Sequence, residues 1–256
     1  MGYSKTQGLI LKNQPGDEKN NFVTVYTTHF GKITYLAKGL QKNKARLKAA
    51  LEPFSYSEII SSKGHYYEVI TRATLIESFW SPCEKFSSQT LKFYFLDLID
   101  RLTEEGERDP RLLTLLRGTL KSLGSLAKKD ELLEPKLLLL LCYFSLKTLK
   151  FLGYLPEFSS CVACGKKLTP KNNFFSFKLG GIICSQCRPL DKRAFPVTAL
   201  QIKIIRLASQ KRWSYFKKIK APLLVLKRVA WLSNFWVFYV LGKIPSSYKF
   251  IRNFFD

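Results

Sequence analysis

The residues with the clearest chemical potential are four cysteines in two matched pairs. Cys161 and Cys164 form one C-x-x-C pair, Cys184 and Cys187 form the other, and 19 residues separate the pairs. A tight C-x-x-C turn lets two thiolates converge on one ion, and zinc prefers four such ligands in a tetrahedron. We therefore predict a zinc site, with disulfides, idle thiols and an iron–sulfur cluster as the alternatives.

The same ligand set predicts the role of the metal. Four thiolates complete the tetrahedron and leave no position for water, so we expect the zinc to be structural and not catalytic. Gly165 follows the first pair, at a point where a metal-binding knuckle often needs a positive φ. The other two cysteines, Cys83 and Cys142, stand alone on expected helical faces, and we expect them to be small buried apolar residues.

The elements that position this site begin with a strand-rich part. Before residue 80, short runs of β-branched and aromatic residues are separated by polar or glycine-bearing segments. We expect five strands in a small barrel, with Ile33, Tyr35 and Ala37 on one face of the third strand and Lys63-Gly64 as a tight hairpin turn. The expected strands are 6–11, 22–27, 32–37, 54–61 and 66–76.

From about residue 84 the apolar residues recur at helical spacing instead. We expect helices over 84–105, 110–126, 136–152, 198–209 and 222–241. The chain then divides into a barrel domain at 1–80 and an α-helical domain at 81–256, which carries the zinc-binding element at 158–190. The apolar run Val229–Gly242 has 14 residues, fewer than the about 20 of a spanning helix, so we expect a buried helix there.

The chain is strongly basic, with 42 Lys and Arg against 19 Asp and Glu and a net charge of +23. Such an excess repels itself unless an anionic partner, such as a polyphosphate backbone, relieves it. Five of the cations fall within the eleven residues 38–48, with no acid before Glu52. We expect a loop there that tracks a phosphate backbone. A ribosome-associated role, an anionic membrane surface, a lysine-rich proteome and a merely solvated segment are the alternatives.

Two further features bear on nucleic-acid binding. Tyrosines lie on the strands near the basic loop, and we expect one or two of them to be exposed as stacking platforms for unpaired bases. Other basic groups are spread along the chain, including those within 211–220. Three roles are open for them: further contacts to DNA, contacts to acidic protein partners, or simple solvation. The tyrosines are Tyr26, Tyr35, Tyr56, Tyr66 and Tyr67.

Nothing in the chain matches a familiar catalytic pattern. It contains no G-x-x-x-x-G-K-[ST], G-x-S-x-G or H-E-x-x-H motif. The two histidines, His29 and His65, lie in expected turns, and the acidic group at 104–109 has the pattern of a solvated helix end. We expect a protein that is not an enzyme, with an unrecognised metal-dependent nuclease as the alternative. Residues 1–12 lack the pattern of an export signal, so we expect a cytoplasmic location.

Three ordered stretches resemble the RecO family of bacterial recombination mediators. The first is Gly31-Lys32, then Ala37-Lys38-Gly39, the basic run to Arg46, and 51–54 (LEPF). The second is 152–156 (LGYLP) leading into Cys161-x-x-Cys164-Gly165, and the third is Cys184-x-x-Cys187. Their order and spacing fit the family over most of the chain, to about residue 242.

The resemblance implies an α+β multidomain protein with an N-terminal OB-fold and a helical domain that carries the zinc element. It implies binding of single- and double-stranded DNA, annealing of complementary strands, and help in loading RecA onto strands covered by single-strand-binding protein. Implied partners are RecR, with RecF as a further candidate, and the tail of single-strand-binding protein. The family's basic barrel surface carries over, as a region, onto Lys32, Lys38, Lys42, Lys44, Arg46 and Lys48.

An RNA- or ribosome-binding zinc-ribbon protein is the alternative from another class, since a basic surface explains RNA binding equally well. Residues 248–256 match nothing in the resemblance.

Overall fold

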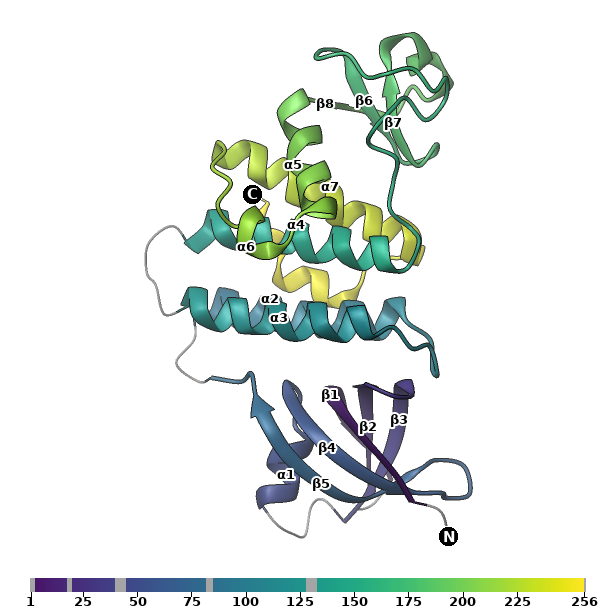
Figure 1. Cartoon of the computed structure of the whole chain (residues 1–256), viewed down its shortest axis with the longest axis vertical. Coiled ribbons are helices and arrows are strands. Elements are labelled where there is room, and N and C mark those ends of the chain that lie inside the picture. The colour runs from purple at the N-terminus through teal and green to yellow at the C-terminus, as the bar shows by residue number, and fades with distance from the viewer. Residues whose placement is uncertain (1–2, 18–19, 40–44, 82–84, 128–132, 256) are drawn as a thin grey trace. The chain divides into compact units, whose positions relative to one another are not determined.

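The computed structural model describes residues 3–17, 20–39, 45–81, 85–127 and 133–255. The chain forms two compact units, which we call the barrel unit (residues 1–129) and the helical unit (residues 130–256). The expected α+β architecture is confirmed: strands come first, helices follow, and a small cysteine-bearing sheet interrupts the helices (Figure 1).

The barrel unit opens with a closed five-stranded barrel in the order β1-β2-β3-β5-β4, the arrangement of an OB-like fold. All neighbouring strands pair antiparallel except β3 and β5, which pair in parallel at Leu36 and Val69. Tyr35 and Ala37 are buried and Ile33 packs against the same core, as the alternation predicted. The strands are β1 (Tyr3–Pro15), β2 (Asn20–Thr27), β3 (Gly31–Lys38), β4 (Ser55–Ser62) and β5 (Val69–Ser78).

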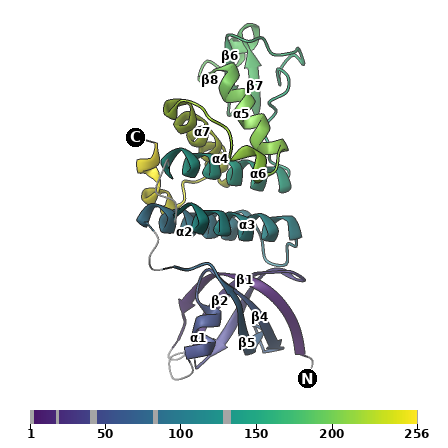
Figure 2. The same cartoon turned by 60° about the vertical axis from the view of Figure 1, so that its left-hand side comes forward.

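Two connections in the barrel differ from the sequence prediction. The segment expected to be a loop contains a helix, α1 (Ala45–Leu51), which packs against β5 and β4 (Figure 2). Its Leu51 side chain is fully buried in the barrel core. The prediction of a tight turn at Lys63-Gly64 is wrong, because residues 63–68 form a longer connection between β4 and β5. Gly64 is needed there, since a Cβ would lie 2.2 Å from the Tyr67 carbonyl oxygen.

Two helices complete the barrel unit: α2 (Phe86–Leu102) and α3 (Pro110–Ala127). They pack on each other and on β1, and they lie side by side in Figures 1 and 2. Asp109 ends the connection between them, and its carboxylate accepts a hydrogen bond from the Arg111 amide at 2.8 Å. Carboxylate acceptors of this kind satisfy free amides at a helix start, and proline at the first helical position has no amide to satisfy.

The helical unit is built on α4 (Leu133–Phe151), α5 (Ala199–Gln210) and α7 (Leu223–Leu241), which pack on one another. A short helix, α6 (Trp213–Phe216), joins α5 to α7, and the 3-10 turns η2 (Ser246–Phe250) and η3 (Arg252–Phe254) end the chain. Among the described residues, α7 alone has the length and composition to cross a membrane. Core helices share those properties, and α7 buries residues such as Val237 and Leu226 against its neighbours.

A three-stranded sheet with the order β7-β6-β8 carries the cysteines. Its elements are β6 (Asn173–Ser176), β7 (Gly181–Cys184), the 3-10 turn η1 (Ser185–Leu190) and β8 (Phe195–Val197). The prediction ended this element at residue 190 and missed β8. We call residues 158–197 the ribbon. Thr198 follows it at once and caps α5 through a reciprocal capping box with Gln201, so the ribbon enters the helix without a linker.

The compact units differ from the expected domains at 1–80 and 81–256. The change from strand to helix falls where the sequence places it, between the end of β5 at Ser78 and the start of α2 at Phe86. However, α2 and α3 pack with the barrel, and the compact units divide after Lys129.

Candidate metal centre and nucleic-acid interface

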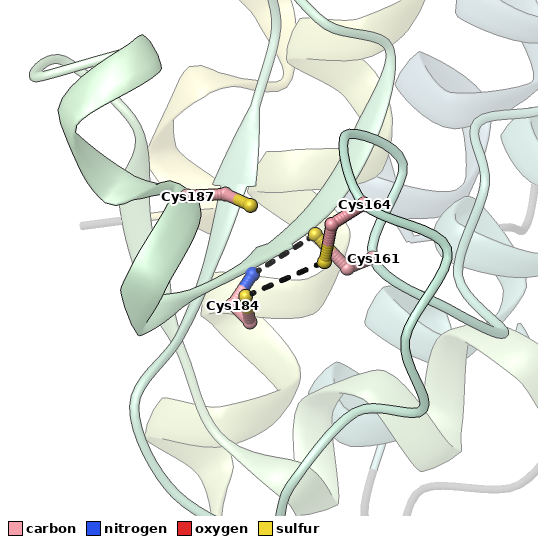
Figure 3. Close-up of side chains that lie close together, drawn as sticks. All are labelled: Cys161, Cys164, Cys184 and Cys187. Carbon is pink, nitrogen blue, oxygen red and sulfur yellow. Dashed lines mark hydrogen bonds between the residues drawn. The ribbon is translucent and has the colours of Figure 1, made fainter.

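The four paired cysteines meet at one end of the ribbon. Cys161 and Cys164 lie in the turn before β6, Cys184 ends β7, and Cys187 lies in η1. All four Sγ atoms lie within 4.8 Å of one another, and those of Cys164 and Cys184 are 3.9 Å apart (Figure 3). The structure therefore brings together the complete set that the sequence predicted, as a possible metal-binding site.

The first cysteine pair is held in a tight knuckle. The Gly165 amide donates to the Cys161 carbonyl at 2.8 Å, and the Cys161 amide donates to the Lys166 carbonyl at 2.9 Å. Gly165 has a φ of 72°, the left-handed conformation that the sequence predicted at this position. A side chain would strain this backbone, so the glycine lets the chain reverse directly after Cys164.

The sulfur atoms lie in an environment that favours charge on one thiol and opposes it on another. Burial raises the pKa of Cys161, but hydrogen bonds from the backbone amides of Cys184, Cys164 and Ala163 outweigh it and lower the pKa to about 6. Partial desolvation and the neighbouring sulfurs raise the pKa of Cys187 to about 12. A cation between the sulfurs would favour the thiolate form of all four cysteines.

Little apolar material supports this end of the ribbon. Its buried cluster consists of Cys161, Ile183 and Ala194, with a few half-buried side chains around them. Such a small core supplies little folding free energy, which is why small elements of this kind often need a metal. By contrast, Cys142 is buried in α4, and burial raises its pKa to about 12, as expected for an inert thiol. Cys83 lies outside the described residues.

The second candidate site is one end of the barrel, which we call the loop end. Asn20 at the start of β2 pairs with Lys38 at the end of β3, and Leu36 of β3 pairs with Val69 at the start of β5. The end of β1, the start of β2, the end of β3 and the connection 63–68 therefore lie at the same end of the barrel. In OB-folds the β1–β2 and β4–β5 loops are among the parts that bind oligonucleotides.

The tyrosines divide as expected between the core and the surface. Tyr26, Tyr35 and Tyr56 are buried, whereas Tyr66 is 87% exposed and Tyr67 is 44% exposed. Both exposed rings lie in the connection 63–68 at the loop end. Tyr67 packs edge-on against Phe22, with ring centroids 5.1 Å apart. Tyr66 is thus the ring most available for stacking on an unpaired base.

Some of the predicted DNA-binding cations are exposed in the structure, and others lie outside the described residues. Lys38 is exposed at the end of β3, and Lys48 is exposed on α1. Lys42 and Lys44 lie outside the described residues, as does the side chain of Arg46. One loop-end cation, Lys63, was missed by the sequence analysis and is exposed. The sequence could have identified Lys63, because it lies between the fourth and fifth expected strands, where small barrels often bind nucleic acid.

Lys32 makes all its described polar contacts within the barrel unit, and its DNA-binding role stays a prediction. Its ammonium donates to the carbonyls of Asp100, at 2.6 Å, and Thr103, and it lies 3.7 Å from the Asp100 carboxylate. Only 12% of the side chain is exposed. Cations are favoured beside the free carbonyls at a helix C-terminus, so Lys32 binds the end of α2.

The segment around 104–109 covers the barrel beside Lys32. Tyr26 accepts a hydrogen bond from the Asp109 amide at 3.1 Å, and Arg108 donates to the Thr28 carbonyl at 2.9 Å. A Cβ on Gly31 would lie 2.2 Å from the Glu107 carbonyl oxygen. Residues 104–109 therefore do more than form a solvated turn. They pack on the barrel surface next to Lys32, where DNA was expected to bind. The two histidines, His29 and His65, are both exposed.

A closed five-stranded barrel, a helical unit and a four-cysteine ribbon define a class of protein that combines an OB-like fold with a candidate metal centre. Models of the N- and C-terminal parts of recombination protein O match residues 1–79 and 85–248. The chain belongs to the RecO family.

Curated relatives agree with this assignment. DNA repair protein RecO of Alkaliphilus metalliredigens is 33% identical over 217 residues, which cover 84% of this chain and 85% of the relative. DNA repair protein RecO of Thermoanaerobacter sp. is 28% identical over 230 residues, covering 90% and 89%. That of Dehalococcoides mccartyi strain 195 is 26% identical over 245 residues, covering 95% and 92%.

Proposed function

We propose that this chain is a DNA repair and recombination mediator that binds single- and double-stranded DNA and anneals complementary strands. We further propose that it helps to load RecA onto strands covered by single-strand-binding protein. The observation that carries the proposal is the loop end, where the exposed cations Lys38 and Lys63 accompany the exposed ring of Tyr66. Membership of a family whose relatives are named DNA repair proteins supports it.

The loop end suits a polynucleotide because it offers two kinds of contact. Cations neutralise phosphates and release condensed counterions, which supplies sequence-independent affinity. An aromatic face stacks on any unpaired base and leaves its pairing edge accessible. Annealing then requires no bond chemistry: the protein reduces the repulsion between two strands and raises their local concentration. We accordingly propose that the chain is not an enzyme.

We propose that the four-cysteine site holds a structural zinc ion. For a Zn–S bond of about 2.3 Å, the edge of a regular tetrahedron is about 3.8 Å, close to the 3.9 Å between the Cys164 and Cys184 sulfurs. All four ligands come from the protein, so no position remains for a substrate or water. The ion would join the knuckle at Cys161–Cys164 to the end of β7, where the apolar cluster of the ribbon is small.

The proposed partners follow the family. They are RecR, with RecF as a further candidate, the tail of single-strand-binding protein, and RecA indirectly. A net charge of +23 suits both DNA and acidic protein segments, and the proposed location is the cytoplasm, in association with the nucleoid.

The deciding experiment is annealing of complementary strands by the purified protein, with and without single-strand-binding protein on them. Acceleration in both cases supports the proposal. RNA that displaces single-stranded DNA at much lower concentration would instead favour the RNA-binding alternative. Cutting of labelled DNA with Mg²⁺ or Mn²⁺, lost in a carboxylate variant, would overturn the proposal that the chain is not an enzyme.

Tyr66→Ala is expected to weaken binding of single-stranded DNA by about 5- to 150-fold, because stacking on one aromatic ring contributes about 1–3 kcal/mol. Binding of duplex DNA, whose bases are already stacked, should change much less. Fluorescence anisotropy with single- and double-stranded oligonucleotides measures both. Tyr66→Phe keeps the ring and should bind as the wild type does. Equal losses for both DNA forms would argue against stacking.

Reversing the charge at Lys42, Lys44 and Arg46 together is expected to weaken DNA binding similarly for all sequences. It should also flatten the dependence of the binding constant on salt, because fewer counterions are released. Titrations at several salt concentrations with two unrelated sequences test this. An unchanged affinity and salt dependence would place the phosphate contacts elsewhere in the chain.

A further inference from the structure

The excess of positive charge is concentrated away from the barrel. The helical unit has 22 Lys and Arg against 6 Asp and Glu, a net +16, whereas the barrel unit has 20 against 13, a net +7. Residues 192–255 contain 14 Lys and Arg and no Asp or Glu. The charge that points to a polyanionic partner is therefore carried largely by the helical unit.

The densest part of this charge is the segment that contains α6. Five cations fall within the ten residues 211–220, and all five are exposed. We call them the α6 cation cluster: Lys211, Arg212, Lys217, Lys218 and Lys220.

The α6 cation cluster lies on a backbone that is held in place. The Arg212 carbonyl accepts hydrogen bonds from the amides of Tyr215 and Phe216, both at 3.1 Å. The Phe216 side chain is fully buried, and its ring lies 5.8 Å from that of Tyr143 on α4. The surface is thus preorganised, and a ligand that binds it would not have to order the segment.

Two more ammonium groups lie beside the start of the cluster. Lys147 and Lys150 of α4 both donate to the Ser209 carbonyl near the end of α5, at 3.1 and 3.2 Å. Burial, and then the charge of Lys150, lower the pKa of Lys147. These two lysines bind the carbonyl end of α5, which explains their position. Their charges still add to the positive potential next to Lys211.

The described acids of the helical unit have other partners. Glu134 lies 3.5 Å from the ammonium of Lys227, and Glu157 accepts hydrogen bonds from backbone amides of the residues that follow it. Asp191 accepts a hydrogen bond from the Ser176 hydroxyl at 2.6 Å. No ion pair between these acids and the α6 cation cluster occurs among the described residues.

We propose that the α6 cation cluster is a second phosphate-backbone-binding surface of this chain, specific for nucleic acid as a polymer and not for its sequence. The inference deepens the proposed function and rests on it. A single strand carries one charge about every 3.4 Å, a density that suits closely spaced cations. Tyr215 is 55% exposed, and Lys211 lies 5.6 Å from its ring centroid. The segment thus pairs cations with an aromatic face, as single-strand-binding surfaces do.

A second surface has a direct consequence for annealing. The loop end belongs to the barrel unit and the α6 cation cluster belongs to the helical unit. One chain can then hold two strands at once, each on its own unit, so that pairing between them becomes intramolecular. The gain is one of effective concentration and requires no new contact between the strands and the protein.

The test compares two variants that each remove four positive charges from the helical unit. The first is R212Q/K217Q/K218Q/K220Q, in the α6 cation cluster. The second is K167Q/K171Q/K178Q/K192Q, at exposed lysines of the ribbon. Both give the same net charge, so any difference between them depends on position. Binding of a long single strand is titrated at several salt concentrations, and the annealing rate of the full chain is measured alongside.

For the cluster variant, the slope of log K against log salt should become shallower by up to about 3, at about 0.7 for each lost phosphate contact. The annealing rate should fall by about tenfold or more, and the ribbon variant should stay close to the wild type in both measurements. The charge-preserving variant R212K/K217R/K218R/K220R should bind and anneal normally. If the quadruple cluster variant does not fold, the K217Q/K218Q pair should show about half the change in slope.

The outcomes separate the two proposals. If the wild type binds no DNA, the proposed function fails. If it binds DNA and the cluster variant matches the ribbon variant, the second surface is refuted while the first stands. If the cluster variant keeps its DNA affinity but loses binding to a Glu- and Asp-rich peptide, the partner is an acidic protein and the inference is overturned.

Discussion

Cys161→Ser is expected to abolish stable metal binding and to unfold the ribbon. Cys161 is the most buried of the four cysteines, and its sulfur accepts a hydrogen bond from the Cys184 amide at 3.4 Å. In small zinc-finger peptides a structural zinc contributes about 10–16 kcal/mol of folding free energy. The cysteine-bearing end of the ribbon has only a small apolar cluster besides the metal site, so most of that contribution should be lost.

Metal analysis of the purified protein should give about one zinc per chain for the wild type and well below one for Cys161→Ser. Hydrogen exchange should show loss of amide protection in β6 and β7, while α4 and α7 remain protected. Cys142→Ala is the matched control, since this buried cysteine lies outside the site, and it should keep its zinc. A metal-free Cys161→Ser protein with a protected ribbon would refute the structural role of the metal.

Phe175→Ala is expected to cost about 3–5 kcal/mol of stability, the usual range for truncating a buried phenylalanine. The Phe175 ring is fully buried, and it packs against Phe158 in the ribbon and Trp236 of α7. Trp236 in turn donates to the Tyr154 carbonyl at 2.8 Å. Truncation should therefore leave a cavity where the ribbon meets the helices, with the metal site still intact.

Thermal unfolding measures this effect, with an expected fall in Tm of about 6–20 °C, at about 2–4 °C for each kcal/mol. Zinc content should not change, which distinguishes this variant from Cys161→Ser. Leu190→Ala is the control, because Leu190 is 57% exposed at the end of η1, and its Tm should stay within about 2 °C of the wild type. A small effect of Phe175→Ala would mean that the ribbon is stabilised by its metal alone.

The structure changes where DNA contacts are expected on the barrel. The sequence analysis placed Lys32 and Lys38 on one basic surface, because the resemblance to the RecO family implies such a surface on the barrel. They differ because Lys32 faces the end of α2, where backbone carbonyls bind its ammonium, while Lys38 lies at the loop end and is exposed. The proposed surface therefore keeps Lys38 and adds Lys63, while the DNA-binding role of Lys32 stays a prediction.

Local sequence patterns were enough to predict the four-cysteine cluster and most of the elements. The spacing of the two C-x-x-C pairs, with Gly165 after the first, specifies a knuckle whatever the rest of the chain does, because backbone sterics within a few residues decide it. The alternation at Ile33, Tyr35 and Ala37 similarly fixes which face of β3 enters the core. Helices with repeated leucines were predicted to within a few residues for the same reason.

Only the tertiary structure decided which polar and aromatic side chains remain available to a partner. Tyr26 and Tyr66 are the same residue type in the same barrel, yet one is fully buried and the other is 87% exposed. The pairing of distant strands brought Lys63 and Lys38 to one end, and the packing of α2 placed its backbone carbonyls beside the Lys32 ammonium. Burial and ion pairing depend on contacts between residues far apart in sequence, and local propensity and periodicity contain no information about those contacts.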